Sequence, residues 1–295
     1  MFKKYLRSIF LIYSCAFFAG GCGTKGPLNI IDNLNQPKIA LVLGGGAARG
    51  FAHVGVIRTL EKEKIPIDMI VGTSVGSLVG AIYADKMNSF ELEWEAFKLE
   101  REDIFDFSIL RAKRGPVKGD KLENFVLQHI TAKNIEDLKI PYAAVAVDLF
   151  TGEEVIIKKG SLSKAIHASS SIPGVFEPLY YMDRTLVDGG VLGNIAPEAA
   201  RDMGADIVIT VDIGKNVEKS GSDSNVVEIT LQTINIMSKK IDSYKQKETD
   251  ILIQPSVGNV DFKDFSQKKE CMMAGIAAAE KELPAIKKLI LSYEK

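Results

Sequence analysis

Gly72-Thr73-Ser74-Val75-Gly76 lies between two runs of different character. Ile67–Val71, before it, is mostly apolar and compatible with a β-strand, and Ser77–Tyr83, after it, fits a buried helix. A strand, a Gly-x-Ser-x-Gly turn and a helix form a nucleophile elbow, whose tight turn projects the serine Oγ into a cleft. Gly72 and Gly76 are the small neighbours that such a turn needs. The pattern predicts Ser74 as a nucleophile; the alternative is a glycine-rich turn that only packs a helix against a sheet.

A second glycine-rich loop precedes the elbow. Lys38–Leu43 predicts the first core strand, and Gly44–Gly50 follows it, ahead of a helix from about Phe51 to Lys64. Consecutive N–H groups at a helix N-terminus bind negative charge. One use is a dinucleotide fingerprint, but Arg49 stands where its third glycine belongs, and Asp68 opens its strand instead of closing it. The favoured use is an oxyanion hole beside Ser74, because both loops would lie at the carboxyl edge of a parallel sheet.

A serine nucleophile needs a base, and the chain has three histidines. His53, His129 and His167 all lie in runs that predict helices, and none stands at the end of a predicted strand, where the histidine of a triad is expected. Each is therefore interpreted as a packed helix residue.

Three aspartates follow predicted strands. Asp148 ends one strand, Asp188 ends another and Asp212 follows a third, so we expect all three near one sheet edge. Only Asp188 is followed by two glycines, Gly189 and Gly190, which clear space for close approach. Asp188 is the predicted base, and the other two are interpreted as turn caps. Its ionisation is expected below the range of histidine, near about 6.5, unless burial raises its pKa.

Three motifs in this order resemble those of the patatin-like phospholipase family: Gly44–Gly50, Gly72–Gly76 and Asp188-Gly189-Gly190. Further agreement lies in Ala168–Phe176 and Asn194–Pro197, and the resemblance covers roughly Lys38 to Lys215. It implies a Ser–Asp dyad that hydrolyses the acyl esters of lipids or phospholipids without a histidine, a metal or a cofactor.

The resemblance also implies roles for the glycine loop. Backbone N–H groups of Gly45, Gly46 and their neighbours, Ala47 and Arg49 among them, would form the oxyanion hole. Ala47 departs from the family, many of whose members carry a glycine there, so the backbone freedom of the loop is reduced. Arg49 matches the family's basic position and would steer an anionic head group or brace the hole. The alternative is an arginine at a helix start that pairs with a surface carboxylate.

The composition suits one large α/β domain: the chain has 295 residues, 46% of them hydrophobic and 25% charged. Alternating strands and helices predict a mostly parallel central sheet with helices on both faces, the three-layer α/β/α arrangement of the resembled family. The domain is expected over 38–295, with a catalytic core at 38–215. The completion, 216–295, is predicted to contain a flexible loop, a helix, a strand and closing helices: Ser220–Asn225, Val226–Lys247, Asp250–Gln254 and Lys268–Ser292.

The N-terminus predicts a lipoprotein-type signal peptide over residues 1–21. Basic residues precede a short apolar run, and two glycines stand directly before Cys22. Cys22 is the expected lipidation site and residues 22–37 a tether, which predicts a lipid-anchored protein of the bacterial cell envelope, in the outer membrane if the cell is Gram-negative. The alternative is cleavage to a secreted or periplasmic protein. Cys271 would remain alone in the mature chain, so no intramolecular disulfide is expected.

The charge of the mature chain bears on its partners. Without residues 1–21 it carries 34 basic and 38 acidic side chains, a net charge of −4. Nucleic acid is therefore not expected as a partner, and membrane contact would have to come from the lipid anchor. A competing class is a non-catalytic envelope lipoprotein that binds lipid or a protein partner through the same cleft. Within the enzyme class, thioesters and soluble esters remain open.

One segment interrupts the alternation of strands and helices. Residues 86–120 mix charged side chains with aromatic ones, namely Phe90, Trp94, Phe97, Phe105 and Phe107. The segment is either a lid or acyl-chain wall over the site or a helical excursion that packs its aromatic residues into the core.

Overall fold

The computed structural model describes residues 36–104, 116–214, 226–258, 260 and 264–293, which belong to one compact unit, Gln36–Lys295. The predicted signal peptide, Cys22, nearly all of the tether, the loop at Ser220–Asn225, and Phe105 and Phe107 lie outside these residues. In the part of the chain that is described, no helix is long and apolar enough to cross a bilayer.

The described residues build one eight-stranded sheet in the order β5-β6-β3-β2-β1-β7-β8, with β4 paired to β3. The strands β1, β2, β3, β7 and β8 run parallel. β4 and β6 pair antiparallel with β3, and β5 pairs antiparallel with β6 at the edge of the sheet. The predicted mostly parallel sheet is thus confirmed. The strands are β1 (Ile39–Leu43), β2 (Met69–Thr73), β3 (Tyr142–Asp148), β4 (Glu154–Ile157), β5 (Leu179–Tyr181), β6 (Arg184–Asp188), β7 (Ile207–Val211) and β8 (Ile251–Ile253).

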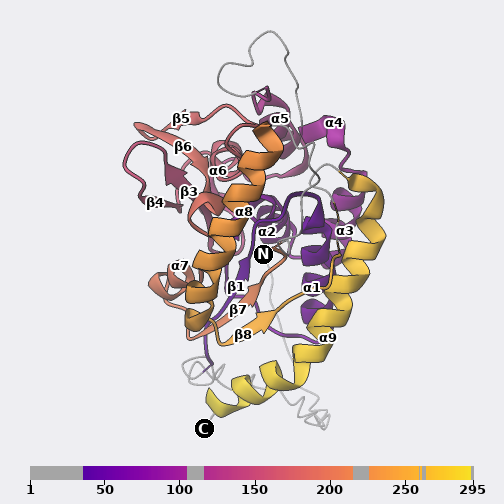
Figure 1. Ribbon diagram of the computed structural model, residues 1–295. Coiled ribbons are helices and arrows are strands. Elements are labelled where there is room, and N and C mark those ends of the chain that lie inside the picture. The colour runs from indigo at the N-terminus through magenta and orange to yellow at the C-terminus, as the bar shows by residue number, and fades with distance from the viewer. Residues whose placement is uncertain (1–35, 105–115, 215–225, 259, 261–263, 294–295) are drawn as a thin grey trace, which may run out of the picture. The chain divides into compact units, whose positions relative to one another are not determined.

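Helices cover both faces of the sheet (Figure 1). Alternate side chains of β1 enter different cores: Leu41 packs in the larger one with α1, α2 and α9, and Val42 in a smaller one with α7. The two-residue period of a strand buried on both faces explains this division. The helices are α1 (Phe51–Lys62), α2 (Val75–Lys86), α3 (Ser89–Lys98), α4 (Arg101–Ile104), α5 (Asp120–His129), α6 (Leu162–Ser169), α7 (Pro197–Asp202), α8 (Val226–Lys245) and α9 (Lys268–Tyr293).

The C-terminal completion differs from its prediction in one respect. The helix at Val226 and the strand at Ile251 form as expected, but Lys268–Tyr293 is one continuous helix, with Pro284 inside it, instead of several closing helices. Its Gly275 crosses α1 closely, because a Cβ there would lie 2.0 Å from the carbonyl oxygen of Ala52. This contact lays α9 along α1 (Figure 1).

In the described part of the segment 86–120, the aromatic residues divide between the core and the surface. Phe97 packs edge-on against Phe51, with ring centroids 6.1 Å apart, as a core residue does. Phe90 and Trp94, by contrast, are 73% and 57% exposed. Helix α3 therefore packs against the core by one face only.

Candidate active site

Ser74 occupies a sharp turn between β2 and α2. Its backbone has φ 54° and ψ −126°, a region that a residue other than glycine rarely adopts. Both elbow glycines are required because a side chain would clash with neighbouring backbone. A Cβ on Gly72 would lie 2.5 Å from the Cα of Ser77, and one on Gly76 would lie 2.1 Å from the carbonyl oxygen of Leu43. A strained serine between a strand and a helix is the geometry of a nucleophile elbow.

A second serine hydrogen-bonds to the backbone of the elbow. The Ser74 N–H donates to the Oγ of Ser169 over 2.9 Å, and that hydroxyl donates to the carbonyl of Val145 over 2.6 Å. Ser169 is fully buried at the end of α6. It belongs to the stretch Ala168–Phe176, for which the sequence indicated a resemblance but no role.

Asp188 lies near Ser74 in the sheet, but its strand runs in a direction that the sequence did not predict. We expected it at the carboxyl edge because it ends its strand, but β6 is antiparallel to β3, so its end points toward the opposite edge. The register explains its position: Thr73 is level with Val145 on β3, and Asp188 is level with the next residue, Ala146. Because β6 begins beyond the carboxyl ends of the parallel strands and runs back along β3, its last residue, Asp188, lies next to Ser74.

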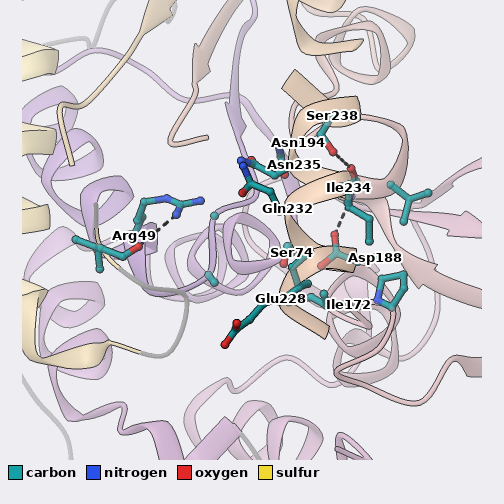
Figure 2. A pocket seen from close by; sticks show the side chains of 17 residues that line it. Arg49, Ser74, Ile172, Asp188, Asn194, Glu228, Gln232, Ile234, Asn235 and Ser238 are labelled. Atoms are coloured by element: carbon teal, nitrogen blue, oxygen red, sulfur yellow. Dashed lines mark hydrogen bonds between the residues drawn. The ribbon is translucent and has the colours of Figure 1, made fainter. Parts of the chain in front are cut away.

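The Asp188 carboxyl is buried beside the Ser74 hydroxyl (Figure 2). Its Oδ1 accepts the N–H of Gly190 over 2.7 Å. Burial raises the pKa of Asp188 to about 6, against the opposing effects of hydrogen bonds from Ser74 and from the Gly190 N–H. The following glycine is required for this approach, since a Cβ on Gly189 would lie 2.6 Å from the carbonyl oxygen of Val145.

Two connected cavities open at Ser74. The polar chamber, about 290 Å³, is lined by Ser74, Asp188, Asn194 and the α8 residues Glu228, Gln232 and Asn235 (Figure 2). The apolar chamber, about 60 Å³, is lined mainly by Phe51, Leu78, Ile82, Leu99, Ile104 and Phe176. Ala47, Ser74 and Ile172 belong to both, so the serine stands at the junction of a polar and an apolar space.

The glycine loop requires a correction to the predicted oxyanion hole. The N–H of Gly45 already donates to the carbonyl oxygen of Asn194 over 2.9 Å, so it is engaged. Gly46 and Ala47 line the polar chamber with Ser74, and within the described part of the chain no protein acceptor takes their N–H groups. These two are the donors that fit the hole. Gly45 contributes space instead, because a Cβ there would lie 2.9 Å from Oδ1 of Asn194.

Of the roles expected for Arg49, the structure shows the brace and not an oxyanion-hole donor. Its side chain is 8% exposed, and its Nε donates to the carbonyl of Ile213 over 2.8 Å. A terminal nitrogen donates to the carbonyl of Val260 over 3.4 Å, apart from the Ser74–Asp188 pair (Figure 2). Its backbone N–H donates to Gly46 over 3.2 Å. Arg49 is thus a brace that ties the glycine loop to the segments after β7 and β8.

The histidines have partners elsewhere. Burial lowers the pKa of His53 to about 4, and its neutral ring donates from Nε2 to the carbonyl of Gly44 over 2.8 Å. His129 contacts Glu95 over 2.6 Å and His167 contacts Glu123 over 2.7 Å. All three are described, and none lines the two chambers.

The other two strand-end aspartates have the predicted capping contacts. Asp148 accepts the N–H of Phe150 over 2.9 Å and contacts Arg184 over 3.2 Å. Asp212 accepts the N–H of Gly214 over 2.8 Å. Among the described residues no group of three or more His, Cys, Asp or Glu could hold a metal ion.

Sequence reasoning missed the contribution of α8. Ser238 and Asp242 are buried on its inner face, one turn apart, and both contact the connection between Asp188 and α7. The available signal was two polar residues four positions apart on the face of an amphipathic helix that should be apolar.

Comparison with known proteins agrees with this geometry. Residues 41–201 match the patatin-like phospholipase family. Patatin-like phospholipase domain-containing protein 6 of Homo sapiens is 34% identical over 193 residues, covering 63% of this chain and 14% of that protein. An uncharacterized NTE family protein of Mycobacterium tuberculosis is 34% identical over 206 residues, covering 69% of this chain and 56% of that protein. The chain thus spans a small part of the first relative and about half of the second.

Among solved structures, VipD from Legionella pneumophila matches with a TM-score of 0.51 at 13% identity, over 85% of this chain and 67% of VipD. A likeness at this identity concerns the fold alone. The match over residues 41–201 contains the strand, both glycine-rich loops and the aspartate described above. By this match the chain belongs to the patatin-like phospholipase family.

Proposed function

We propose that this protein is a serine acyl hydrolase that cleaves lipid esters with a Ser74–Asp188 dyad. The observation that carries the proposal is the strained Ser74 beside the buried Asp188, with which its side chain hydrogen-bonds, in a cavity that contains no histidine among its described lining residues. A pKa of about 6 leaves Asp188 mostly ionised at neutral pH, yet close enough to neutrality to accept a proton and return it.

The chemical steps follow from the positions of these groups. Asp188 takes the proton of the Ser74 hydroxyl as Oγ attacks the ester carbonyl, and the N–H groups of Gly46 and Ala47 hydrogen-bond the resulting oxyanion. The tetrahedral intermediate collapses, the carbon–oxygen bond to the alcohol breaks, and Asp188 gives its proton to the leaving oxygen. Water, deprotonated by Asp188, then attacks the acyl-enzyme. As the second tetrahedral intermediate collapses, Asp188 returns this proton to the Oγ of Ser74, which releases the carboxylic acid and restores Ser74.

The two chambers favour a lipid ester as the substrate. We assign the acyl chain to the side of the apolar chamber, whose wall includes Leu99 and Ile104 of the segment 86–120. The alcohol or head group fits the polar chamber on the α8 side. In this arrangement Leu99 and Ile104 form part of an acyl-chain wall.

The proposed site of action is the bacterial cell envelope, through a lipid on Cys22. It rests on the signal pattern of residues 1–21 and on the net charge of −4, which offers no attraction to anionic membranes. Several acyl chains on one cysteine would anchor the protein stably.

A fluorophosphonate probe, which reacts with activated serines, tests the enzymatic proposal. We expect purified protein to be labelled and Ser74→Ala to remain unlabelled at an unchanged melting temperature. Ser77→Ala is the matched control, since Ser77 is a buried serine that donates to the carbonyl of Ser74, and it should retain labelling. Folded wild-type protein that takes no label would instead favour a non-catalytic lipoprotein that binds its ligand through the same cleft.

A further inference from the structure

Helix α8 contacts the loop that carries Asp188. The Oγ of Ser238 donates to the carbonyl of Gly190, whose own N–H donates to Oδ1 of Asp188 over 2.7 Å. One buried serine on α8 is thus two hydrogen bonds away from the proposed base. Figure 2 shows Ser238 on the helix that crosses the polar chamber.

A second α8 residue, Asp242, binds the end of the loop that leads from Asp188 to α7. Asp242 is 3% exposed, and its Oδ1 accepts the N–H of Ile195 over 3.3 Å. Its Oδ2 accepts the side-chain N–H of Asn194, also over 3.3 Å. The loop approaches closely because Gly193 has φ 114°, and a Cβ there would lie 2.8 Å from the Asp242 carboxylate.

Asn194 lies between the two catalytic loops. Its backbone carbonyl accepts the N–H of Gly45 over 2.9 Å. Its Oδ1 lies 2.9 Å from the position of a Cβ on Gly45 and 3.0 Å from that of a Cβ on Gly190. One asparagine thus sets the spacing between the glycine loop and the loop after Asp188.

We propose that Asp242 is a positioning residue for the acyl transfer, acting through Asn194 to hold the glycine loop and the Asp188 loop in register around Ser74. This inference rests on the proposed function. It assigns to α8 a role in the site beyond covering the polar chamber.

The chemistry of the two side chains explains why a carboxylate is needed at position 242. An ionised carboxylate only accepts hydrogen bonds, so it turns the Asn194 amide with its nitrogen toward Asp242 and its oxygen toward the two glycines. Burial, and to a smaller extent Asp212, raises the pKa of Asp242 to about 6, which leaves it mostly ionised at neutral pH. An asparagine at 242 has the same shape but carries N–H groups. Whichever way its amide turns, one N–H would face the N–H of Ile195 or of Asn194.

The test compares Asp242→Asn with Asp85→Asn. Asp85 is a matched buried carboxylate, 5% exposed, that accepts the N–H groups of Thr131 and Ala132 away from the two chambers. On a short soluble ester, we expect Asp242→Asn to lower kcat about 10- to 100-fold with little change in KM, the size expected for a small misplacement of reacting groups. Its melting temperature should fall no further than that of Asp85→Asn, because both variants lose buried hydrogen bonds of the same kind. Asp85→Asn should lower the melting temperature and leave kcat unchanged.

Two further measurements complete the test. In an Asn194→Ala background, Asp242→Asn should lower kcat by less than twofold, because Asp242 acts through Asn194. By NMR, the Gly45 amide hydrogen should exchange about tenfold faster or more in Asp242→Asn than in the wild type. An unchanged kcat, additive losses in the double variant, or unchanged Gly45 exchange would overturn the inference. The exchange measurement needs no activity, so a wild type that cleaves no ester would defeat the proposed function and leave the positioning of the loop to be judged by exchange.

Discussion

Ala47 stands where the resemblance led us to expect a glycine, and its backbone has a conformation that suits glycine. It has φ 51°, in the left-handed region, which costs a residue with a Cβ roughly 1–2 kcal/mol. Ala47 also lines both chambers. The chain therefore carries strain at a residue whose N–H fits the oxyanion hole.

We expect Ala47→Gly to leave the free energy of unfolding unchanged or to raise it, because relief of the left-handed strain offsets the extra flexibility of glycine in the unfolded chain. Ala277→Gly is the control: Ala277 is exposed on α9, where the same replacement should cost about 1 kcal/mol. Urea denaturation measures the free energy of unfolding of each variant relative to the wild type. Equal losses would mean that the conformation of Ala47 stores no strain.

At the scale of elements, the packing of α9 on α1 depends on two glycines. A Cβ on Gly55 would lie 2.0 Å from the carbonyl oxygen of Met272, and one on Gly275 would lie 2.0 Å from that of Ala52. Both contacts are to backbone, which cannot turn aside as a side chain can. The two helices can approach this closely only because neither carries a side chain at the crossing.

We therefore expect Gly275→Ala to lower the free energy of unfolding by about 1–3 kcal/mol through overpacking, although alanine favours helix. Met273→Ala, at a 51% exposed position of the same helix, should change it by less than about 0.5 kcal/mol. Chemical denaturation measures the free energies of unfolding of the two variants. A Gly275→Ala protein as stable as the wild type would show that the helices can separate at no cost.

At the scale of the whole molecule, the sequence predicted the nucleophile elbow and most of the strands because both are local patterns, but it did not predict β4 or β5. Periodic apolar runs predict β1, β2 and β7, and the glycines around Ser74 predict a turn. The antiparallel direction of β6 was not predictable in this way, since strand direction depends on pairing with β3, which is distant in sequence. Asp188 was predicted as the base from the glycines that follow it; the structure places it beside Ser74, although its strand runs opposite to the expected direction.

The details of the site were less predictable for a similar reason. Whether a loop N–H is available depends on which acceptor the fold brings to it, and Asn194 takes that of Gly45 across about 150 positions of sequence. The same holds for Arg49, whose acceptors at Ile213 and Val260 lie on distant segments. A local motif identifies a loop, and the tertiary structure decides which of its groups are available.

Attachment to the envelope is also a property of the whole molecule. If Cys22 carries the lipid, Cys22→Ala should move the protein from the membrane fraction to the soluble fraction and leave its activity on a dispersed substrate unchanged. Cell fractionation and mass spectrometry of the mature N-terminus measure both points. An unmodified N-terminus at another residue would rule out the anchor.

The buried Asp188 also links the proposed dyad to stability. Its folded pKa of about 6 exceeds the unfolded value near 3.8, so the folded protein binds more protons between these pH values. Its contribution to the free energy of unfolding therefore falls as pH rises through this window and stays low above about pH 6. Asp188→Asn removes this cost and should stabilise the protein at pH 8, by up to about 3 kcal/mol for a shift of two units.

The most direct test of the Ser74–Asp188 dyad is the turnover of Asp188→Asn at pH 8, beside the variants His53→Gln, His129→Gln and His167→Gln. A pH profile of the wild type alone is insufficient, because an aspartate with a pKa of about 6 titrates close to the range of histidine. We predict that Asp188→Asn is at least as stable as the wild type and has lost turnover, while each folded histidine variant keeps most of its activity. A folded Asp188→Asn protein that still turns over, beside a folded histidine variant that does not, would contradict the dyad.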